Sequence, residues 1–195
     1  MTYRRYRKVN LTPLWVLIAV NFVILIATYI KPGVIFGLFG LQPISFLARP
    51  WTIVTCLFVH GGMWHFIANM ITLFFFGRFL CLLIGETNFL TTYFLGGILG
   101  SIFYLLIGLL QSPFSIAVGA SGAVFALGGV LAMMRPKLRV FIFPIPVPLP
   151  LWAAILGGFI ILALFPNVAW QAHLGGLVYG LATGYFFRSK ERRLY

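Results

Sequence analysis

One serine and one histidine, each in a glycine-rich stretch, are the residues of this chain best suited to catalysis. Ser121 is flanked by Gly119, Ala120 and Gly122, which leave an open approach to its hydroxyl oxygen. Small residues in membrane helices also serve close packing, so the serine alone does not indicate chemistry. A serine nucleophile needs a base, and imidazole suits that role near neutral pH. We therefore predict that His173 activates Ser121.

Other polar side chains at the same predicted depth suit the stabilisation of a developing negative charge. His65 and Asn69 are four residues apart and share one helix face. We predict that they and the backbone N–H of Ser121 donate hydrogen bonds to an oxyanion. The three histidines, His60 included, could instead bind a transition metal. The chain offers no carboxylate near them to complete a metal site, and such a site would give Ser121 no role. We therefore expect neither metal nor cofactor.

The acidic residues exclude several classes of protease. Glu86 and Glu191 are the only two, and the chain has no aspartate. An intramembrane protease with paired aspartates and a Ser-His-Asp triad are therefore excluded, and the HExxH zinc motif is absent. A serine protease built on this chain must therefore work without an aspartate.

These residues must be positioned by helices that cross a membrane. Of 195 residues, 62% are hydrophobic and only 8% are charged, a composition far from that of soluble domains. The apolar residues form blocks close to the roughly 20 residues that span the hydrocarbon core. The net charge of +12 does not indicate a nucleic-acid partner, because the basic residues lie at helix ends rather than on one face.

The apolar blocks predict an all-α polytopic membrane protein with six transmembrane helices in a single domain, residues 1–195. The helices are expected at residues 13–30, 64–83, 89–110, 115–134, 151–165 and 169–187. With both termini cytoplasmic, only Lys31 and Arg49 of the 14 lysines and arginines lie outside, a strong positive-inside bias. Arg135, Lys137 and Arg139, between the fourth and fifth helices, are interpreted as determinants of this topology that also suit contact with anionic lipid heads.

Three motifs share an order and a spacing with a known family. They are His60-x4-His65-x3-Asn69, Gly119-x-Ser121-Gly122 and Ala172-His173-x2-Gly176-x3-Gly180. On the second, fourth and sixth helices, they resemble the motifs of the rhomboid family of intramembrane serine proteases. Gly176, Gly180 and Gly184 also form a small ridge that would let the sixth helix press against the fourth.

The resemblance implies a rhomboid-like bundle with a Ser121–His173 dyad that has no acid. It also implies an oxyanion hole lined by His65 and Asn69, a structural role for His60, and packing of Phe125 on the His173 ring. The chain departs from the family at two positions linked to loop anchoring and packing. Trp51 is followed by Thr52 where rhomboids often carry arginine, and Cys81 stands where they often carry glutamate.

The function implied is hydrolysis of peptide bonds in or near transmembrane segments of membrane proteins. The expected partners are transmembrane substrates and the lipid bilayer of the cell membrane, with the active site open to the non-cytoplasmic side. The alternative is an inactive rhomboid-like protein that binds membrane clients without cleaving them. The presence of both Ser121 and His173 favours the enzyme, because inactive relatives typically lose one or both.

Overall fold

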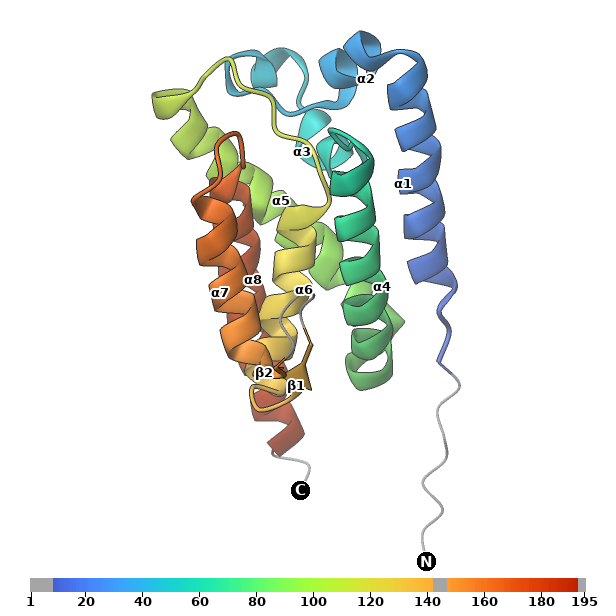
Figure 1. The fold of residues 1–195 in the computed structure, drawn as a ribbon, viewed down its shortest axis with the longest axis vertical. Helices are drawn as coiled ribbons and strands as arrows, with labels where there is room; N and C mark the ends of the chain where they lie inside the picture. Colours follow the sequence, from blue (N-terminus) through green and yellow to red (C-terminus); the bar gives the residue numbers. More distant parts are fainter. Residues whose placement is uncertain (1–8, 142–146, 193–195) are drawn as a thin grey trace, which may run out of the picture.

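Six long helices form a bundle in the computed structural model, which describes residues 9–141 and 147–192. They are α1 (Thr12–Ile30), α4 (Met63–Ile84), α5 (Glu86–Gln111), α6 (Ser121–Met134), α7 (Leu151–Ala163) and α8 (Trp170–Arg192), shown in Figure 1. The basic residues at positions 4, 5, 7 and 8 and the prolines at 144 and 146 lie outside the described residues. The start of α1 and the end of α8 lie at the same end of the bundle (Figure 1).

Short elements connect the long helices at both ends of the bundle. Between α1 and α4 the chain forms α2 (Pro32–Phe39), η1 (Pro43–Ala48), α3 (Thr52–Thr55) and η2 (Cys56–Phe58). Prolines begin α2 and η1, where a missing N–H costs nothing. Between α6 and α7, β1 (Arg139–Val140) pairs antiparallel with β2 (Leu149–Pro150).

The length and apolar character of the helices indicate an integral membrane protein. The helices α1, α4 and α5 are long and apolar enough to cross a membrane, whereas the apolar helices α6 and α7 are shorter. At 14 residues, α6 rises about 21 Å, which is less than the hydrocarbon core of about 30 Å. The helix α6 alone is therefore shorter than a full membrane crossing.

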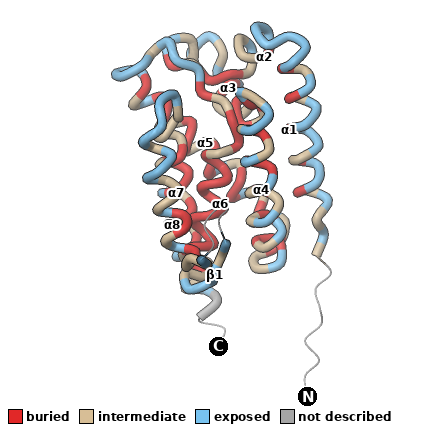
Figure 2. The backbone as a smooth tube through the Cα atoms, viewed as in Figure 1, coloured by how far each residue is buried: buried red, intermediate tan, exposed pale blue. Residues whose placement is uncertain are grey.

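The core of the bundle is α6, which packs against α4, α5, α7 and α8. Nearly every residue of α6 is buried, and Figure 2 shows it as the red centre of the bundle. Many of the exposed large apolar side chains lie on the outer helices, such as Phe22 and Val23 of α1. A helix that is apolar all round and buried all round is the natural support for a precisely placed site.

Glycines bring the backbones of α6 and α8 into contact. A Cβ atom on Gly176 would overlap the carbonyl of Gly122, and one on Gly180 would overlap the carbonyl of Ala126. One turn further on, a Cβ on Gly184 would lie 2.9 Å from the Cα of Val130. The four-residue glycine spacing thus packs the sixth long helix onto the fourth, as the sequence predicted.

The expected start of the fourth long helix, residue 115, is wrong. The helix begins at Ser121, because the preceding chain pairs with a distant segment. Leu41 and Ala117 exchange backbone hydrogen bonds of 3.0 and 2.8 Å, and the N–H of Gly119 donates to the carbonyl of Cys56 at 2.9 Å. Gly119 has φ +124°, which only glycine adopts readily. These hydrogen bonds satisfy backbone groups of the extended chain inside the protein.

The other boundaries differ by smaller amounts. The third long helix begins at Glu86 rather than residue 89, directly after Gly85, whose φ of +88° turns the chain between α4 and α5. The helix α7 ends at Ala163 rather than 165. The helix α8 runs from Trp170 to Arg192 rather than from 169 to 187, because it continues beyond its apolar part into the basic residues.

Candidate active site

Ser121 is the first residue of α6, at the point where the extended chain turns into the helix. The first turn of a helix leaves its N–H groups without partners inside the helix, and the helix dipole makes that end electropositive. The N–H groups of Ser121 and Gly122 therefore stand beside the hydroxyl that would attack a carbonyl. This position suits the stabilisation of an oxyanion.

His173, in the first turns of α8, contacts the serine directly. Its Nε2 lies 2.8 Å from the Ser121 Oγ, which is the distance expected of a nucleophile and its base. The Nδ1 atom is buried without a hydrogen-bond partner among the described residues. The Phe125 ring lies against the imidazole at a centroid distance of 4.8 Å and 31°. Stacking on Phe125, rather than a carboxylate, thus holds the plane of the ring.

His65 reaches the same place from α4. The N–H of Gly61 approaches the Nδ1 of His65 at 3.4 Å, so in the neutral ring the Nε2 carries the proton and is a donor. A Cβ atom on Gly119 would lie 2.6 and 2.7 Å from the Cε1 and Nε2 of His65, and 3.7 Å from the Ser121 Oγ. The histidine edge and the serine hydroxyl therefore border the space that glycine leaves open.

Asn69 lies one turn further along α4 and is buried. Its Nδ2 donates to the carbonyl of His65 at 2.8 Å. This bond uses one of the two amide hydrogens and leaves the second as a donor.

His60 packs behind His65 rather than beside the serine. It is fully buried in the loop before α4, and its ring centroid lies 5.1 Å from that of His65 and 5.5 Å from that of Phe66, both edge-on. Burial, and secondarily the neighbouring His65, lowers the pKa of His60 to about 3. The ring is therefore neutral at physiological pH and supports His65 by packing. Within the described residues, no group of three or more potential ligand side chains could hold a metal.

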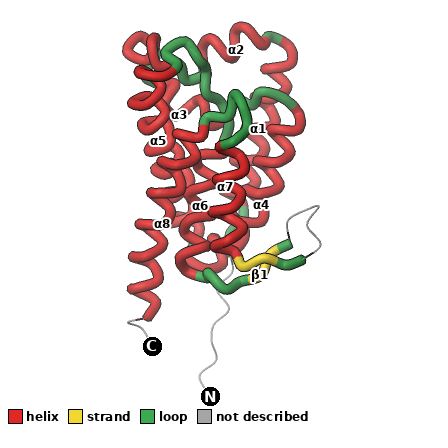
Figure 3. Tube along the Cα trace, turned by 60° about the vertical axis from the view of Figure 1, so that its left-hand side comes forward, coloured by secondary structure: helices red, strands yellow, loops and turns green. Residues whose placement is uncertain are grey.

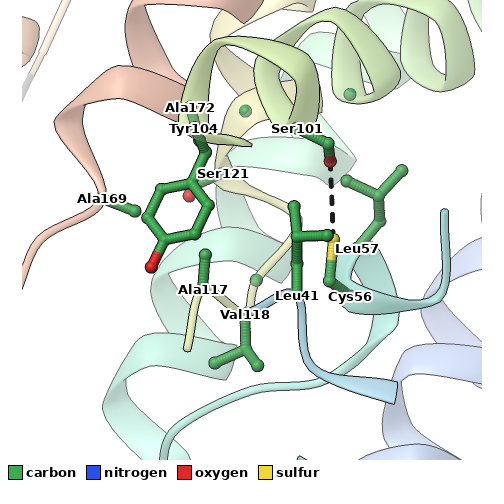
Figure 4. A pocket seen from close by; sticks show the side chains of 13 residues that line it. Leu41, Cys56, Leu57, Ser101, Tyr104, Ala117, Val118, Ser121, Ala169 and Ala172 are labelled. Carbon is green, nitrogen blue, oxygen red and sulfur yellow. Dashed lines mark hydrogen bonds between the residues drawn. The ribbon is translucent and has the colours of Figure 1, made fainter. Parts of the chain in front are cut away.

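A small cavity lies on one side of Ser121, between α5, α8 and the extended chain (Figure 4). It offers about 20 Å³ to the centre of a water molecule, enough for about one water. Its walls include the small residues Gly97, Ala117 and Ala172, and the hydroxyl of Ser101 lies 3.5 Å from the Sγ of Cys56. Polar atoms thus reach the wall of an otherwise apolar cavity beside the serine.

Comparison with known proteins places this geometry in a family. A family model described as the Rhomboid domain matches residues 47–190, which include Ser121, His173 and all the other predicted site residues. The chain belongs to the rhomboid family.

Curated relatives of this rhomboid come from several kingdoms. They include Rhomboid protein 1, mitochondrial, of Saccharomyces cerevisiae (31% identity over 73% of this chain and 45% of that protein) and RHOMBOID-like protein 1 of Arabidopsis thaliana (32%, 70% and 34%). Rhomboid-like protease 3 of Toxoplasma gondii is 35% identical over 72% of this chain and 52% of its own length. The chain therefore spans about a third to a half of the length of these relatives.

In this rhomboid the connection between α1 and α4 is anchored despite Thr52. The side chains of Arg49, Trp51 and Thr55 donate hydrogen bonds to the carbonyls of the last turn of α2, at Gly37, Leu38 and Phe39 respectively. Those carbonyls have no partner within their own helix. A cation two residues before the tryptophan therefore serves this loop, where rhomboids often place one directly after it. Cys81, the second departure, is buried in the main core.

Two contributors to the site had no signal in the sequence. The carbonyl of Cys56 accepts the hydrogen bond that fixes Gly119, and any residue type could supply it. Phe159 of α7 packs edge-on against Phe125 at a centroid distance of 6.1 Å. In a chain with 21 phenylalanines, no pattern distinguishes this one.

Proposed function

We propose that this rhomboid is an intramembrane serine protease that hydrolyses peptide bonds in or near transmembrane segments of membrane proteins. The observation that carries the proposal is the 2.8 Å contact between the Ser121 Oγ and the His173 Nε2. Its support is the setting of that pair, on a buried helix N-terminus beside further hydrogen-bond donors. A hydroxyl and an imidazole at this distance form the working part of a serine hydrolase without an acid.

In the proposed reaction, His173 removes the proton from Ser121 as the oxygen attacks the substrate carbonyl. The oxyanion that forms would accept hydrogen bonds from the Ser121 N–H, the Nε2–H of His65 and the second amide hydrogen of Asn69. His173 then returns the proton to the leaving amine, and water hydrolyses the acyl-enzyme by the same steps. Phe125 keeps the imidazole plane aligned between the two transfers.

We also propose six membrane crossings with both termini cytoplasmic and the site opening to the other side. Supporting this, α1 begins and α8 ends at one end of the bundle (Figure 1), and only Lys31 and Arg49 of the 14 cations would face outward. If α6 ends at the inner boundary of the hydrocarbon core, its rise of about 21 Å would leave Ser121 roughly 9 Å below the outer boundary. The polar side chains clustered there would line a hydrated path by which water reaches that depth.

The cell membrane is the location we propose. The relative from Saccharomyces cerevisiae carries a mitochondrial name, so fractionation of the source cells is the direct test. Recovery of the protein in an organelle fraction alone would overturn this assignment.

Labelling with a serine-reactive fluorophosphonate tests the dyad. We expect the purified protein to be labelled and to cleave a model transmembrane substrate, and expect Ser121→Ala and His173→Ala to lose both activities while remaining folded in detergent. Cleavage retained by Ser121→Ala would show that Ser121 is not the nucleophile. A folded wild-type protein that takes no label but co-purifies with intact membrane clients would identify the inactive, client-binding alternative instead.

The oxyanion donors are tested separately. We expect His65→Ala and Asn69→Ala each to slow turnover, with loss of one such donor typically costing about 10²- to 10³-fold. The rate of substrate cleavage in proteoliposomes is the measurement. Wild-type rates in both single variants and in the double variant would show that these α4 residues are structural.

A further inference from the structure

The hairpin between α6 and α7 presents cations that the bundle does not use. Arg135 donates to the carbonyl of Met134, and Arg188 donates to that of Met133, so both cap the C-terminus of α6. Lys137 and Arg139 are exposed, and neither side chain has a hydrogen bond or ion pair within the described part of the chain. Two of the cations near this hairpin are therefore structural, and two are free to bind a partner.

An aromatic side chain accompanies the free cations. Arg139 and Phe141 flank Val140 along the chain, and Val140 packs against the main core. Successive side chains of a strand point to opposite faces, and Phe141 is 74% exposed. Lys137 precedes them in the turn after α6. We call Lys137, Arg139 and Phe141 the hairpin face.

The position of the hairpin face in the fold indicates which part of the membrane it contacts. The hairpin follows the end of α6 at Met134 and precedes the start of α7 at Leu151, both apolar helices of a membrane protein. With the six crossings proposed above, on which this inference rests, it lies where the hydrocarbon ends and the lipid headgroups begin. In Figure 3 the yellow strand segment labelled β1 lies at the side of the bundle, near its lower end.

We propose that the hairpin face binds anionic phospholipid headgroups. Lys137 and Arg139 would contact the phosphate while Phe141 enters the upper acyl region. Charge complementarity favours this partner, because the two exposed cations match a negatively charged headgroup. The protein itself offers few anions, since Glu86 on α5 is the only acidic residue whose side chain the structure describes. A soluble partner would have to reach the same surface past the headgroups.

Lipid bound there would hold the base of α7. The N–H of Leu151, the first residue of α7, donates to the carbonyl of Leu138 at 2.7 Å, so the hairpin and the helix are joined by a hydrogen bond as well as by the chain. The buried residues of α7 are Leu151, Ala154 and Ile155, all in its first half. The headgroup site therefore fixes the packed end of α7 and leaves its other end free.

Native mass spectrometry of the full chain in neutral detergent tests the proposal, with phosphatidylglycerol and phosphatidylcholine of identical acyl chains as probes. We expect the Lys137→Gln/Arg139→Gln variant to raise the dissociation constant for phosphatidylglycerol about 30-fold, since a cation near the surface contributes about 1 kcal/mol. Binding of phosphatidylcholine should not change. Phe141→Ala should weaken the binding of both lipids alike.

A matched control removes the same charge elsewhere. Arg78 on α4 and Lys190 on α8 are exposed, and Arg78→Gln/Lys190→Gln should change the dissociation constant less than about 3-fold, close to the error of such comparisons. Equal weakening by both double variants would overturn the proposal in favour of diffuse attraction. Displacement of the lipid by inorganic phosphate at constant ionic strength would overturn it in favour of a free-anion site. Thermal unfolding of all variants verifies that they are folded.

Discussion

The helices α7 and α8 both pack against α6, but they do so in opposite ways. Every glycine of α8 lies in contact with another backbone or side chain, and Gly176 and Gly180 leave no room for a Cβ atom. On α7, a Cβ atom added to Gly157 or Gly158 would have no atom of another segment within 4 Å. Backbone contact fixes the interface between α6 and α8, which we call the tight interface. Only a few side chains hold α7 against α6.

The interface between α6 and α8 holds the dyad, whereas the interface between α6 and α7 borders the route by which we expect a substrate to reach it. Ser121 and His173 come from α6 and α8, so their 2.8 Å contact belongs to the tight interface. The helix α7 supplies no dyad residue, and several side chains of its second half, such as Ile160 and Ile161, are more than half exposed. A transmembrane segment could displace this end of α7 without separating the serine from its base. We therefore expect substrates to enter beside α7.

Bulky substitutions on the two interfaces should have very different effects. We expect Gly180→Leu to prevent folding or to lower the free energy of unfolding by more than about 3 kcal/mol, because overpacking at a backbone contact cannot be relieved by a rotamer change. Gly158→Leu, the matched change on α7, should remain folded. Denaturant titration in detergent micelles is the measurement. If the two leucine variants were equally stable, the two interfaces would not differ in how tightly they are packed.

The tight interface could be predicted from the sequence, whereas the start of α6 could not. The Gly176-x3-Gly180 spacing is local and encodes a helix surface directly, so the contact between α6 and α8 followed from it. Residues 115–120 are as compatible with a helix as the residues after them. Their extended form is decided by Leu41, far earlier in the chain, through two backbone hydrogen bonds to Ala117. Backbone pairing at that separation leaves no pattern in a single sequence.

The same limit applies to the details of the site. The contact between Ser121 and His173 was predictable because their chemistry and glycine-rich surroundings are local features. The stacking partner Phe125 came only from a family resemblance, and its neighbour Phe159 could not be distinguished among many phenylalanines. The replacement of an arginine after Trp51 by Arg49 required the carbonyls of α2, which no sequence pattern shows.

Gly119 tests the extended chain that leads into the tight interface. Alanine there must adopt φ near +124° and place its methyl group against the His65 ring. We expect Gly119→Ala to destabilise the protein by about 1 to 3 kcal/mol and to slow cleavage about 10²-fold, as a displacement of about 1 Å at a reacting group can do. Cleavage rate and unfolding should be measured on one preparation. A normal rate would show that His65 and the serine do not share this space.

Hydrogen exchange compares the two regions without any substitution. We expect backbone amides in the second half of α7, residues 157–163, to exchange at least about tenfold faster than those of α6, since local opening needs less free energy where fewer apolar contacts are lost. Exchange followed by mass spectrometry in detergent gives this ratio. Equal protection of both helices would mean that α7 is held as firmly as α6 and that substrates enter elsewhere.

The smallest effect is expected from stiffening α7 itself. Gly157 and Gly158 lie inside the helix with open space around them, so alanine fits at both positions without a clash. Each replacement should stabilise the helix by about 0.5 to 1 kcal/mol, because glycine loses more backbone entropy than alanine. If the end of α7 must bend to admit a substrate, the Gly157→Ala/Gly158→Ala variant will cleave a transmembrane substrate more slowly. Its labelling by fluorophosphonate, a small probe that needs no such opening, will keep the wild-type rate. A parallel fall in both rates would place the defect in the dyad, and an unchanged cleavage rate would show that α7 moves as a rigid body about its packed base.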